Sequence, residues 1–194
     1  MMVLQPVLVF IPEDRTLTGP ERVVRQRAFA RRALAACAER CGLAHLEWSK
    51  DENDVPQPCS GYHWSVSHKP RWAAAVIADR PVGIDLEQVK PRGEHLFDEI
   101  ADDPEWAAVG GQSWPALFRV WTAKEAVLKA NGVGIGKLAS CRIIDAPDAT
   151  HLTLDYEGRR WCVEHYLHGD HLAAVTVDAD PVVWLVHEEK SGHS

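Results

Sequence analysis

The sequence predicts an α+β protein made of two similar halves, and three observations lead to this fold class. The 194 residues are 46% hydrophobic and 25% charged, which are ordinary proportions for a globular protein. Two long segments carry apolar residues at helical spacing, whereas the other apolar segments are short and bounded by turn residues, as strands are. A weak internal repeat aligns residues 68–82 with residues 168–182. We therefore expect two related halves, each an antiparallel sheet packed on a helix.

The first expected helix covers residues 20–41. Its apolar residues recur at roughly helical spacing, and Gly42 stands where a C-cap belongs. Residues 21–40 contain six arginines against two glutamates, although the whole chain has a net charge of −7. Two interpretations of these arginines stay open: a solvated face of the helix, or a site for an anionic ligand.

The second expected helix covers residues 113–131. Ser113 suits the N-cap, Pro115 suits the first turn, and the pair Asn131-Gly132 suits the C-terminal end. Its apolar side chains indicate one buried side, so we expect this helix to pack on a sheet.

Short strands are expected around the second helix. Residues 72–79 and residues 82–89 predict two strands, residues 93–112 a short helix and a loop, and the pattern after residue 135 returns to strands. We place the N-terminal half at residues 1–100 and the C-terminal half at residues 101–194. No low-complexity linker separates the halves, so we expect one compact unit.

Charge, hydropathy and cysteine content exclude several classes of protein. The 21 basic residues against 28 acidic ones argue against a nucleic-acid-binding protein. No apolar run approaches the roughly 18 residues of a membrane span, and the N-terminus lacks the features of a signal peptide. The five cysteines form no CxxC pair, which favours free thiols in a reducing compartment. We expect a cytoplasmic protein.

Asp85 and Glu87 are the first candidates for chemistry. On a strand, residues two apart project to the same face, so the two carboxylates would lie close together. Neighbouring carboxylates repel each other unless a cation lies between them, and a hard divalent ion prefers such oxygen ligands. The alternative is a strand end that reaches solvent.

A second group of candidates lies on the 113–131 helix. Thr122, Glu125 and Lys129 share one face, and Lys124 lies about 100° from Glu125 around the helix axis. A Glu–Lys pair on a solvated surface is the simpler interpretation. The surrounding sequence is strongly apolar, however, and this favours a groove lined by Glu125 and its lysines.

The segment that precedes the strand at 72–79 supplies a third group. Ser67, His68, Lys69 and Arg71 lie within five residues, and together they present groups that bind phosphate oxygens. A Ser67–His68 nucleophile is disfavoured, because adjacent residues of an extended chain point apart and no GxSxG motif is present.

Together these blocks resemble the 4′-phosphopantetheinyl transferase superfamily. The resemblance rests on Ser67-His68, on residues 82–87 (VGIDLE) and on residues 121–129 (WTAKEAVLK). The chain length is similar to that of the two-half, surfactin-synthetase-activating branch, whose fold is a pseudo-dimer within one chain, so a monomer is expected. Lys69-Pro70 replaces the serine that often follows the Ser-His pair in the family.

The resemblance implies an enzyme, a holo-[acyl-carrier-protein] synthase. It would transfer the 4′-phosphopantetheine group from coenzyme A to a serine of an apo acyl or peptidyl carrier protein, and would release adenosine 3′,5′-bisphosphate. Asp85, Glu87 and Glu125 would hold Mg²⁺, with Mn²⁺ as an alternative. The resemblance leaves two candidates for the base that accepts the serine proton, Glu125 and a metal-bound water.

The remaining roles follow from the same resemblance. The expected catalytic residues are Glu125, Lys129 and Asp85. The residues expected to bind coenzyme A are Ser67, His68, Lys124, Lys129, Arg25 and Arg32. Two other functions stay open: a catalytically inactive module that binds coenzyme A or a carrier protein, and a metal-dependent phosphohydrolase that uses the same carboxylates.

Overall fold

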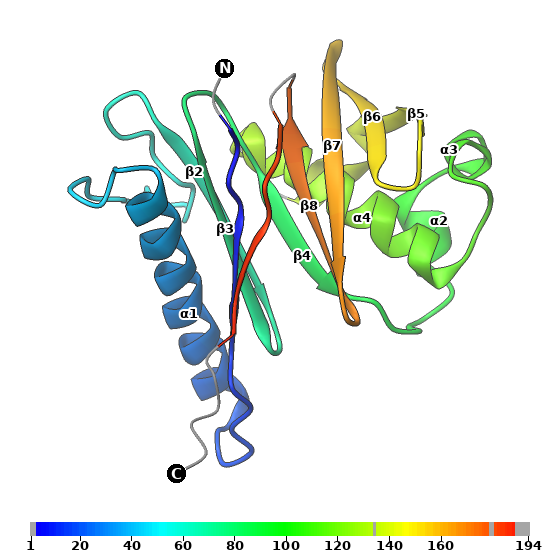
Figure 1. Cartoon of the computed structure of the whole chain (residues 1–194). Helices are drawn as coiled ribbons and strands as arrows, with labels where there is room; N and C mark the ends of the chain where they lie inside the picture. The colour runs from blue at the N-terminus through cyan, green and yellow to red at the C-terminus, as the bar shows by residue number, and fades with distance from the viewer. Residues whose placement is uncertain (1–2, 134, 179–180, 189–194) are drawn as a thin grey trace.

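Two β-sheets pack face to face, and a long helix covers the outer face of each sheet (Figure 1). The computed structural model describes residues 3–133, 135–178 and 181–188. The chain order is β1 (Val7–Phe10), α1 (Gly19–Arg40), β2 (His63–Lys69), β3 (Trp72–Ala78), β4 (Ile84–Gln88), α2 (Leu96–Ile100), α3 (Asp103–Ala108), α4 (Trp114–Ala130), η1 (Ile135–Ser140), β5 (Cys141–Asp145), β6 (His151–Tyr156), β7 (Arg159–His168), β8 (His171–Val177) and β9 (Leu185–His187). The expected α+β class is confirmed.

The sequence predicts both long helices close to their observed ends. Helix α1 begins after Thr18, which forms a capping box with Glu21, and it has a proline in its first turn. Helix α4 begins after Ser113, whose hydroxyl accepts a hydrogen bond from the Ala116 amide. The expected helix and loop at residues 93–112 are two short helices, α2 and α3.

The first sheet has the order β2-β3-β1-β9, and the second has the order β4-β8-β7-β6-β5. All strand pairs are antiparallel except β1 with β9, which is parallel. The first sheet is therefore mixed, where the sequence predicts a purely antiparallel one, because the last strand enters beside β1 in the same direction. Two strands pair across the expected boundary between the halves at residue 100. Strand β4 comes from the N-terminal part and pairs with β8, and β9 comes from the C-terminal part and pairs with β1.

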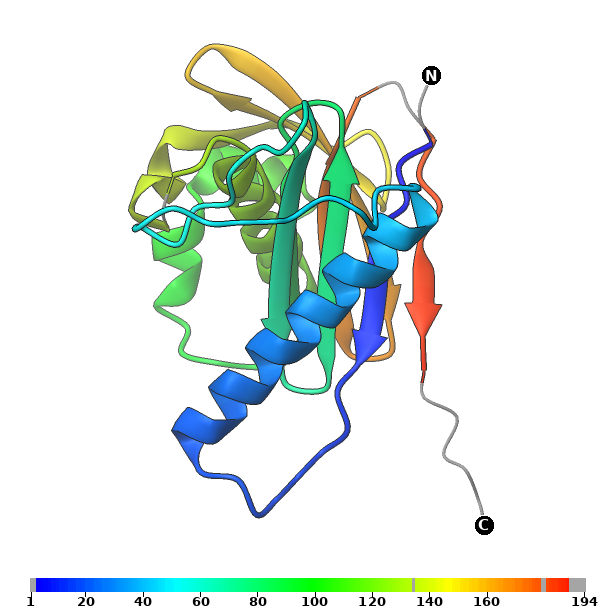
Figure 2. The same cartoon turned by 90° about the vertical axis from the view of Figure 1, so that its left-hand side faces the viewer.

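Strand β3 explains why the two sheets pack so closely. Alternate residues of this all-buried strand face opposite ways: Ala73, Ala75 and Ile77 pack under α1, and the intervening residues pack against the second sheet. Small side chains on both faces allow helix α1, which crosses the first sheet obliquely, to lie close to it (Figure 2). In the part of the chain that the structure describes, no helix has the length and apolar character of a membrane span.

Candidate functional site

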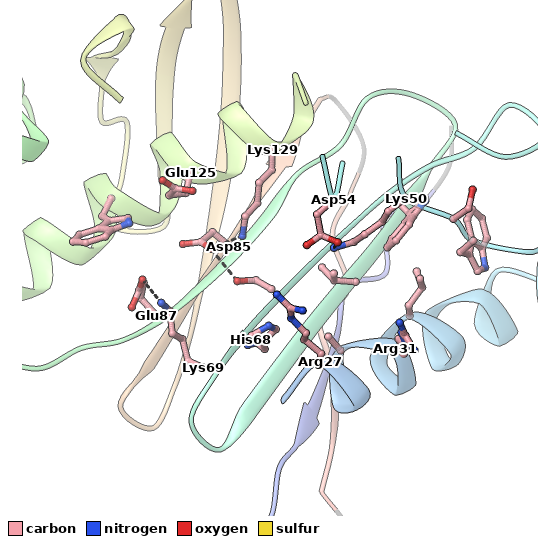
Figure 3. A pocket seen from close by; sticks show the side chains of 18 residues that line it. Arg27, Arg31, Lys50, Asp54, His68, Lys69, Asp85, Glu87, Glu125 and Lys129 are labelled. Carbon is pink, nitrogen blue, oxygen red and sulfur yellow. Dashed lines mark hydrogen bonds and ion pairs between the residues drawn. The ribbon is translucent and has the colours of Figure 1, made fainter. Parts of the chain in front are cut away.

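A cavity of about 710 Å³ lies where the two sheets and both long helices meet. Its walls come from α1, the segment at residues 48–54, β2, β4 and α4. Three carboxylates gather at one end, where Lys69 and Lys129 accompany them, and Arg27, Arg31 and Lys50 gather at the other (Figure 3). The cavity brings together seven residues singled out in the sequence: Ser67, His68, Lys69, Asp85, Glu87, Glu125 and Lys129.

Gly83 brings strand β4 close to helix α4. A Cβ atom at this position would lie 1.9 Å from the Ala126 carbonyl oxygen and 2.7 Å from the Ala130 amide nitrogen, both of them backbone atoms. Only glycine permits this approach without moving the backbone of one element. The close contact carries Asp85, two residues further along β4, toward Glu125 on the helix.

Asp85 is buried, and its two oxygens have different surroundings. Oδ1 accepts hydrogen bonds from the Ser67 hydroxyl at 2.9 Å and from the Lys129 ammonium at 2.6 Å. The same ammonium donates to the Ile84 carbonyl oxygen at 3.2 Å. Oδ2 is also buried but has no hydrogen-bond partner in the structure. Since a buried carboxylate oxygen without a partner is unfavourable, this atom is suited to a ligand.

Glu125 supplies a second unpartnered oxygen. Its Oε1 atom is buried and accepts no hydrogen bond. The pKa of Glu125 is raised to about 7, first by burial and then by the negative charge of Asp85, against the opposing effect of Lys129. A carboxyl group with this pKa exchanges its proton near neutral pH.

Glu87 differs from the other two carboxylates because both of its oxygens are paired. Oε1 lies 2.8 Å from the Lys69 ammonium, and Oε2 accepts a hydrogen bond of 3.0 Å from Arg92. The Arg92 guanidinium in turn lies over the rings of Phe118 and Trp121, 5.0 and 5.6 Å from their centroids. Glu87 is therefore neutralised by the protein itself.

The donor set suits a hard divalent cation. Asp85 and Glu125 each point a buried oxygen without a partner into the same region, and Mg²⁺ is commonly held by one or two carboxylates plus a substrate phosphate. Among the described residues, no group of three or more His, Cys, Asp or Glu side chains is arranged to hold a metal.

The other end of the cavity is basic and aromatic. Arg27 and Arg31 face it from α1, and Lys50, which pairs with Asp54 at 3.1 Å, faces it from the opposite side. The rings of Trp48 and Trp64 meet edge to face in the same wall. Cationic groups beside the partly buried rings in this wall suit a phosphorylated aromatic ligand.

His68 lies between the two ends. One ring nitrogen is 3.2 Å from the Gln26 side-chain oxygen. Burial lowers the pKa of His68, and the positive charges of Lys129, Lys69 and Arg27 lower it further. The imidazole is therefore neutral at physiological pH and acts as a hydrogen-bonding group in the cavity wall.

Lys124 lies outside the cavity, although the sequence pattern suggested a phosphate ligand. Its side chain is 1% exposed, and its ammonium lies 2.8 Å both from the Glu105 carboxylate and from the Ile100 carbonyl oxygen. The physical reason is its position on α4, one residue from Glu125 and thus on a different side of the helix. It ties α4 to α2 and α3.

Arg25 and Arg32 also point away from the cavity. Arg25 donates to the Pro12 carbonyl oxygen and pairs with Asp14 at 3.7 Å, and Arg32 lies over the ring of Phe29. The face of α1 that lines the cavity carries Arg27, Ala30, Arg31 and Leu34. No motif in the sequence singles out Arg27 and Arg31 as the arginines that line the cavity, although the helical spacing of these four residues is visible in the sequence.

A model of the 4′-phosphopantetheinyl transferase superfamily matches residues 81–176. The chain belongs to this superfamily. The match begins just before Gly83 and ends within β8, so it includes the acidic end of the cavity and leaves out α1 and β2. The superfamily model therefore says nothing about the basic end.

Individual relatives of the superfamily match comparable shares of the chain. The 4′-phosphopantetheinyl transferase psf-1 of Bacillus pumilus is 35% identical over 42% of this chain and 36% of its own length. A putative 4′-phosphopantetheinyl transferase of Haemophilus influenzae is 33% identical over 50% of this chain and 45% of its own length. HetI of Nostoc, also named a 4′-phosphopantetheinyl transferase, is 37% identical over 45% of this chain and 40% of its own length. The aligned part of the chain spans less than half the length of these relatives.

Proposed function

We propose that the chain transfers the 4′-phosphopantetheine group of coenzyme A to a serine hydroxyl of an apo acyl or peptidyl carrier protein. Adenosine 3′,5′-bisphosphate is the other product. The observation that carries the proposal is that one cavity combines two kinds of end. One end has Lys129 and two carboxylate oxygens without hydrogen-bond partners, and the other has arginines and tryptophans. The names of the superfamily relatives support the same reaction.

The basic end fits the nucleotide portion of coenzyme A. Arg27, Arg31 and Lys50 supply positive charge for phosphate oxygens, and Trp48 and Trp64 offer apolar ring surface for an adenine base. The cavity volume of about 710 Å³ lies in the range of small-molecule sites. Binding there would direct the diphosphate of coenzyme A toward the carboxylates.

Asp85 and Glu125 are the residues that would hold Mg²⁺. When bound, Mg²⁺ stabilises the negative charge that builds on the leaving phosphate during phosphoryl transfer. The protein positions the groups around it: Ser67 and Lys129 fix the orientation of Asp85, and both are within hydrogen-bonding distance of one carboxylate oxygen.

Two side chains of the cavity are proposed to accept the serine proton and to stabilise the departing phosphate. The serine oxygen of the carrier forms a bond to the phosphorus next to pantetheine, and the bond from that phosphorus to the bridging oxygen breaks. Glu125 lines the cavity beside Asp85, and its carboxylate is the side chain proposed to accept the serine proton. Lys129 lies beside Asp85, where its ammonium can donate a hydrogen bond to the departing phosphate.

We also propose that the two halves form a pseudo-dimer within one chain. The strand order β2-β3-β1 of the first sheet is repeated as β7-β8-β4 in the second, each with its own helix, α1 or α4. The division into residues 1–100 and 101–194, the monomeric state and the cytoplasmic location stay predictions.

The experiment that tests this function is the intact mass of an apo carrier protein after incubation with the chain, coenzyme A and Mg²⁺. We expect a gain of about 340 Da, the mass of the phosphopantetheine group, and no gain when EDTA is present. A chain that binds coenzyme A but modifies none of several acyl and peptidyl carriers would instead be an inactive binding module. Release of the bisphosphate without a carrier would indicate a phosphohydrolase.

A further inference from the structure

The three carboxylates at the acidic end of the cavity do not have equivalent surroundings. Glu87 is 2% exposed, and each of its oxygens already has a cation, Lys69 on one and Arg92 on the other. Asp85 and Glu125, in contrast, each retain a buried oxygen that no hydrogen-bond donor reaches. Among the three carboxylates, these two oxygens are buried and have no hydrogen-bond partner, whereas each oxygen of Glu87 already has one.

One partner of Glu87, Arg92, is held in place by packing. Arg92 rests on the faces of Phe118 and Trp121, so its guanidinium is fixed by packing as well as by the carboxylate. Lys69 ends strand β2, where its Cα pairs in register with that of Trp72 across the tight turn to β3. A metal ion that used Glu87 would have to displace one of these cations and leave it half-buried without a counter-charge.

We propose that Glu87 is not a metal ligand in this chain, and that Lys69 and Arg92 hold it as the buried centre of an ion triad whose two cations are partly exposed. Asp85 and Glu125 alone hold the divalent cation. The inference rests on the proposed function for the need for a metal, and it assigns Lys69, which replaces the serine of the family pattern, a role as a permanent counter-ion.

The charge balance of the cluster follows from this assignment. Acidic and basic side chains are equal in number. The acidic ones are Asp85, Glu87 and Glu125, and the basic ones are Lys69, Arg92 and Lys129. A divalent cation therefore leaves the cluster with a net positive charge, which favours an anionic diphosphate beside it. Mn²⁺ should accordingly bind more tightly when coenzyme A is present.

Charge-matched double variants test the proposal through Mn²⁺ binding, followed by electron paramagnetic resonance with and without coenzyme A. The first variant, Lys69→Met/Glu87→Gln, removes the Glu87 carboxylate and the lysine paired with it. The second, Asp85→Asn/Lys129→Met, removes the Asp85 carboxylate and the lysine paired with it. We expect the first variant to bind Mn²⁺ within about threefold of the wild type, because no ligand and no net charge is lost. The second should weaken binding by at least about tenfold, because a ligand is lost.

A loss of tenfold or more in Lys69→Met/Glu87→Gln, with circular dichroism unchanged, would overturn the proposal. If either variant fails to fold, anomalous diffraction from Mn²⁺-soaked crystals of the wild type decides. The peak should lie at a coordination distance of about 2.1 Å from oxygens of Asp85 and Glu125. A peak at that distance from Glu87 contradicts the assignment.

These outcomes are distinct from those that test the function. A wild-type chain that modifies a carrier protein but binds Mn²⁺ through Glu87 overturns this inference alone. A chain that binds Mn²⁺ through Asp85 and Glu125 but modifies no carrier overturns the proposed function alone.

Discussion

Lys124 and Lys129 lie five residues apart on α4, and the fold gives their ammonium groups different surroundings. Lys124 is buried beside Glu105, away from the cavity. Lys129 lines the cavity and forms an ion pair with Asp85. The difference matters because a buried ion pair and a phosphate-binding lysine respond differently to loss of charge.

The first expectation concerns these two lysines. Lys124→Met removes the nearer of two cations from buried Glu105 and leaves Arg142 at 4.0 Å, so we expect the free energy of unfolding to fall by about 3 kcal/mol. Coenzyme A affinity of the folded protein should stay within about twofold, since no cavity contact is lost. Lys129→Met should show the reverse pattern, with weaker coenzyme A binding and a smaller loss of stability. Urea unfolding and calorimetric titration measure both quantities, and weaker binding in Lys124→Met alone would contradict the expectation.

The second expectation concerns pH and Glu125. Its pKa is raised from 4.5 to about 7 in the folded protein, so the folded state keeps a proton that the unfolded state loses between these values. The contribution of Glu125 to stability is therefore full below about pH 4.5 and decreases as the pH rises through 7. In metal-free protein, Glu125→Gln should become more stable relative to the wild type from pH 5 to pH 8.

Exposed Glu39 provides the control for this measurement. Glu39→Gln should differ from the wild type by the same amount at both pH values, because an exposed carboxylate has little to gain from neutralisation. Urea unfolding at pH 5 and pH 8 with EDTA gives the comparison. A Glu125→Gln difference that does not change with pH would show that burial does not penalise this carboxylate.

Residue spacing predicts part of the site. The alternation of β4 places Asp85 and Glu87 on one face, and the helical period places Glu125 with Lys129, as the sequence indicates. The pairing of Lys124 with Glu105 could not be predicted, because it depends on how α3 packs on α4. The same holds for Arg92, whose partners Glu87 and Phe118 come from separate elements.

At the scale of the element, helix α1 carries arginines both on the face that lines the cavity and on other faces. Capping residues and apolar spacing predict its ends within about two residues, as they do for α4. The sequence motifs do not fix which arginines face the ligand, because that depends on the rotation of the helix against β1 and β3. The structure selects the face with Arg27 and Arg31 rather than that with Arg25 and Arg32.

The third expectation follows from this rotation. Arg27→Ala and Arg31→Ala should each weaken coenzyme A binding by about tenfold or more, the cost of losing a charge-assisted hydrogen bond. Arg25→Ala is the matched control on the same helix, and it should change binding by less than about threefold. Calorimetric titration provides the measurement. Equal losses in all three variants would indicate a general field effect rather than direct contacts.

At the scale of the whole molecule, the two sheets share strands from distant parts of the chain. Strand β4 completes the second sheet and β9 extends the first, and a common core that includes Leu8, Ile84 and Val175 lies between the sheets. The internal repeat predicts one strand before and one strand after each proline turn, and the structure contains these strands as β3 and β4 and as β8 and β9. It does not predict the placement of β4 and β9, because strand partners are chosen by tertiary packing.

The fourth expectation is that the protein unfolds as one unit. Trp64 and Trp72 report on the first sheet, and Trp106 and Trp161 on the second. Because the sheets share a core, urea transitions followed by tryptophan fluorescence and by far-ultraviolet circular dichroism should coincide. Two separated transitions would mean that the halves are independent domains.

The most direct test of the account compares carrier modification by the wild type and by Asp85→Asn, followed by intact mass under saturating coenzyme A and Mg²⁺. We expect Asp85→Asn to keep its circular dichroism spectrum and to lose at least about a hundredfold in turnover, since it removes one of the two carboxylates that face the diphosphate. A folded Asp85→Asn variant that modifies the carrier at the wild-type rate would contradict the assignment of this cavity as the site of transfer.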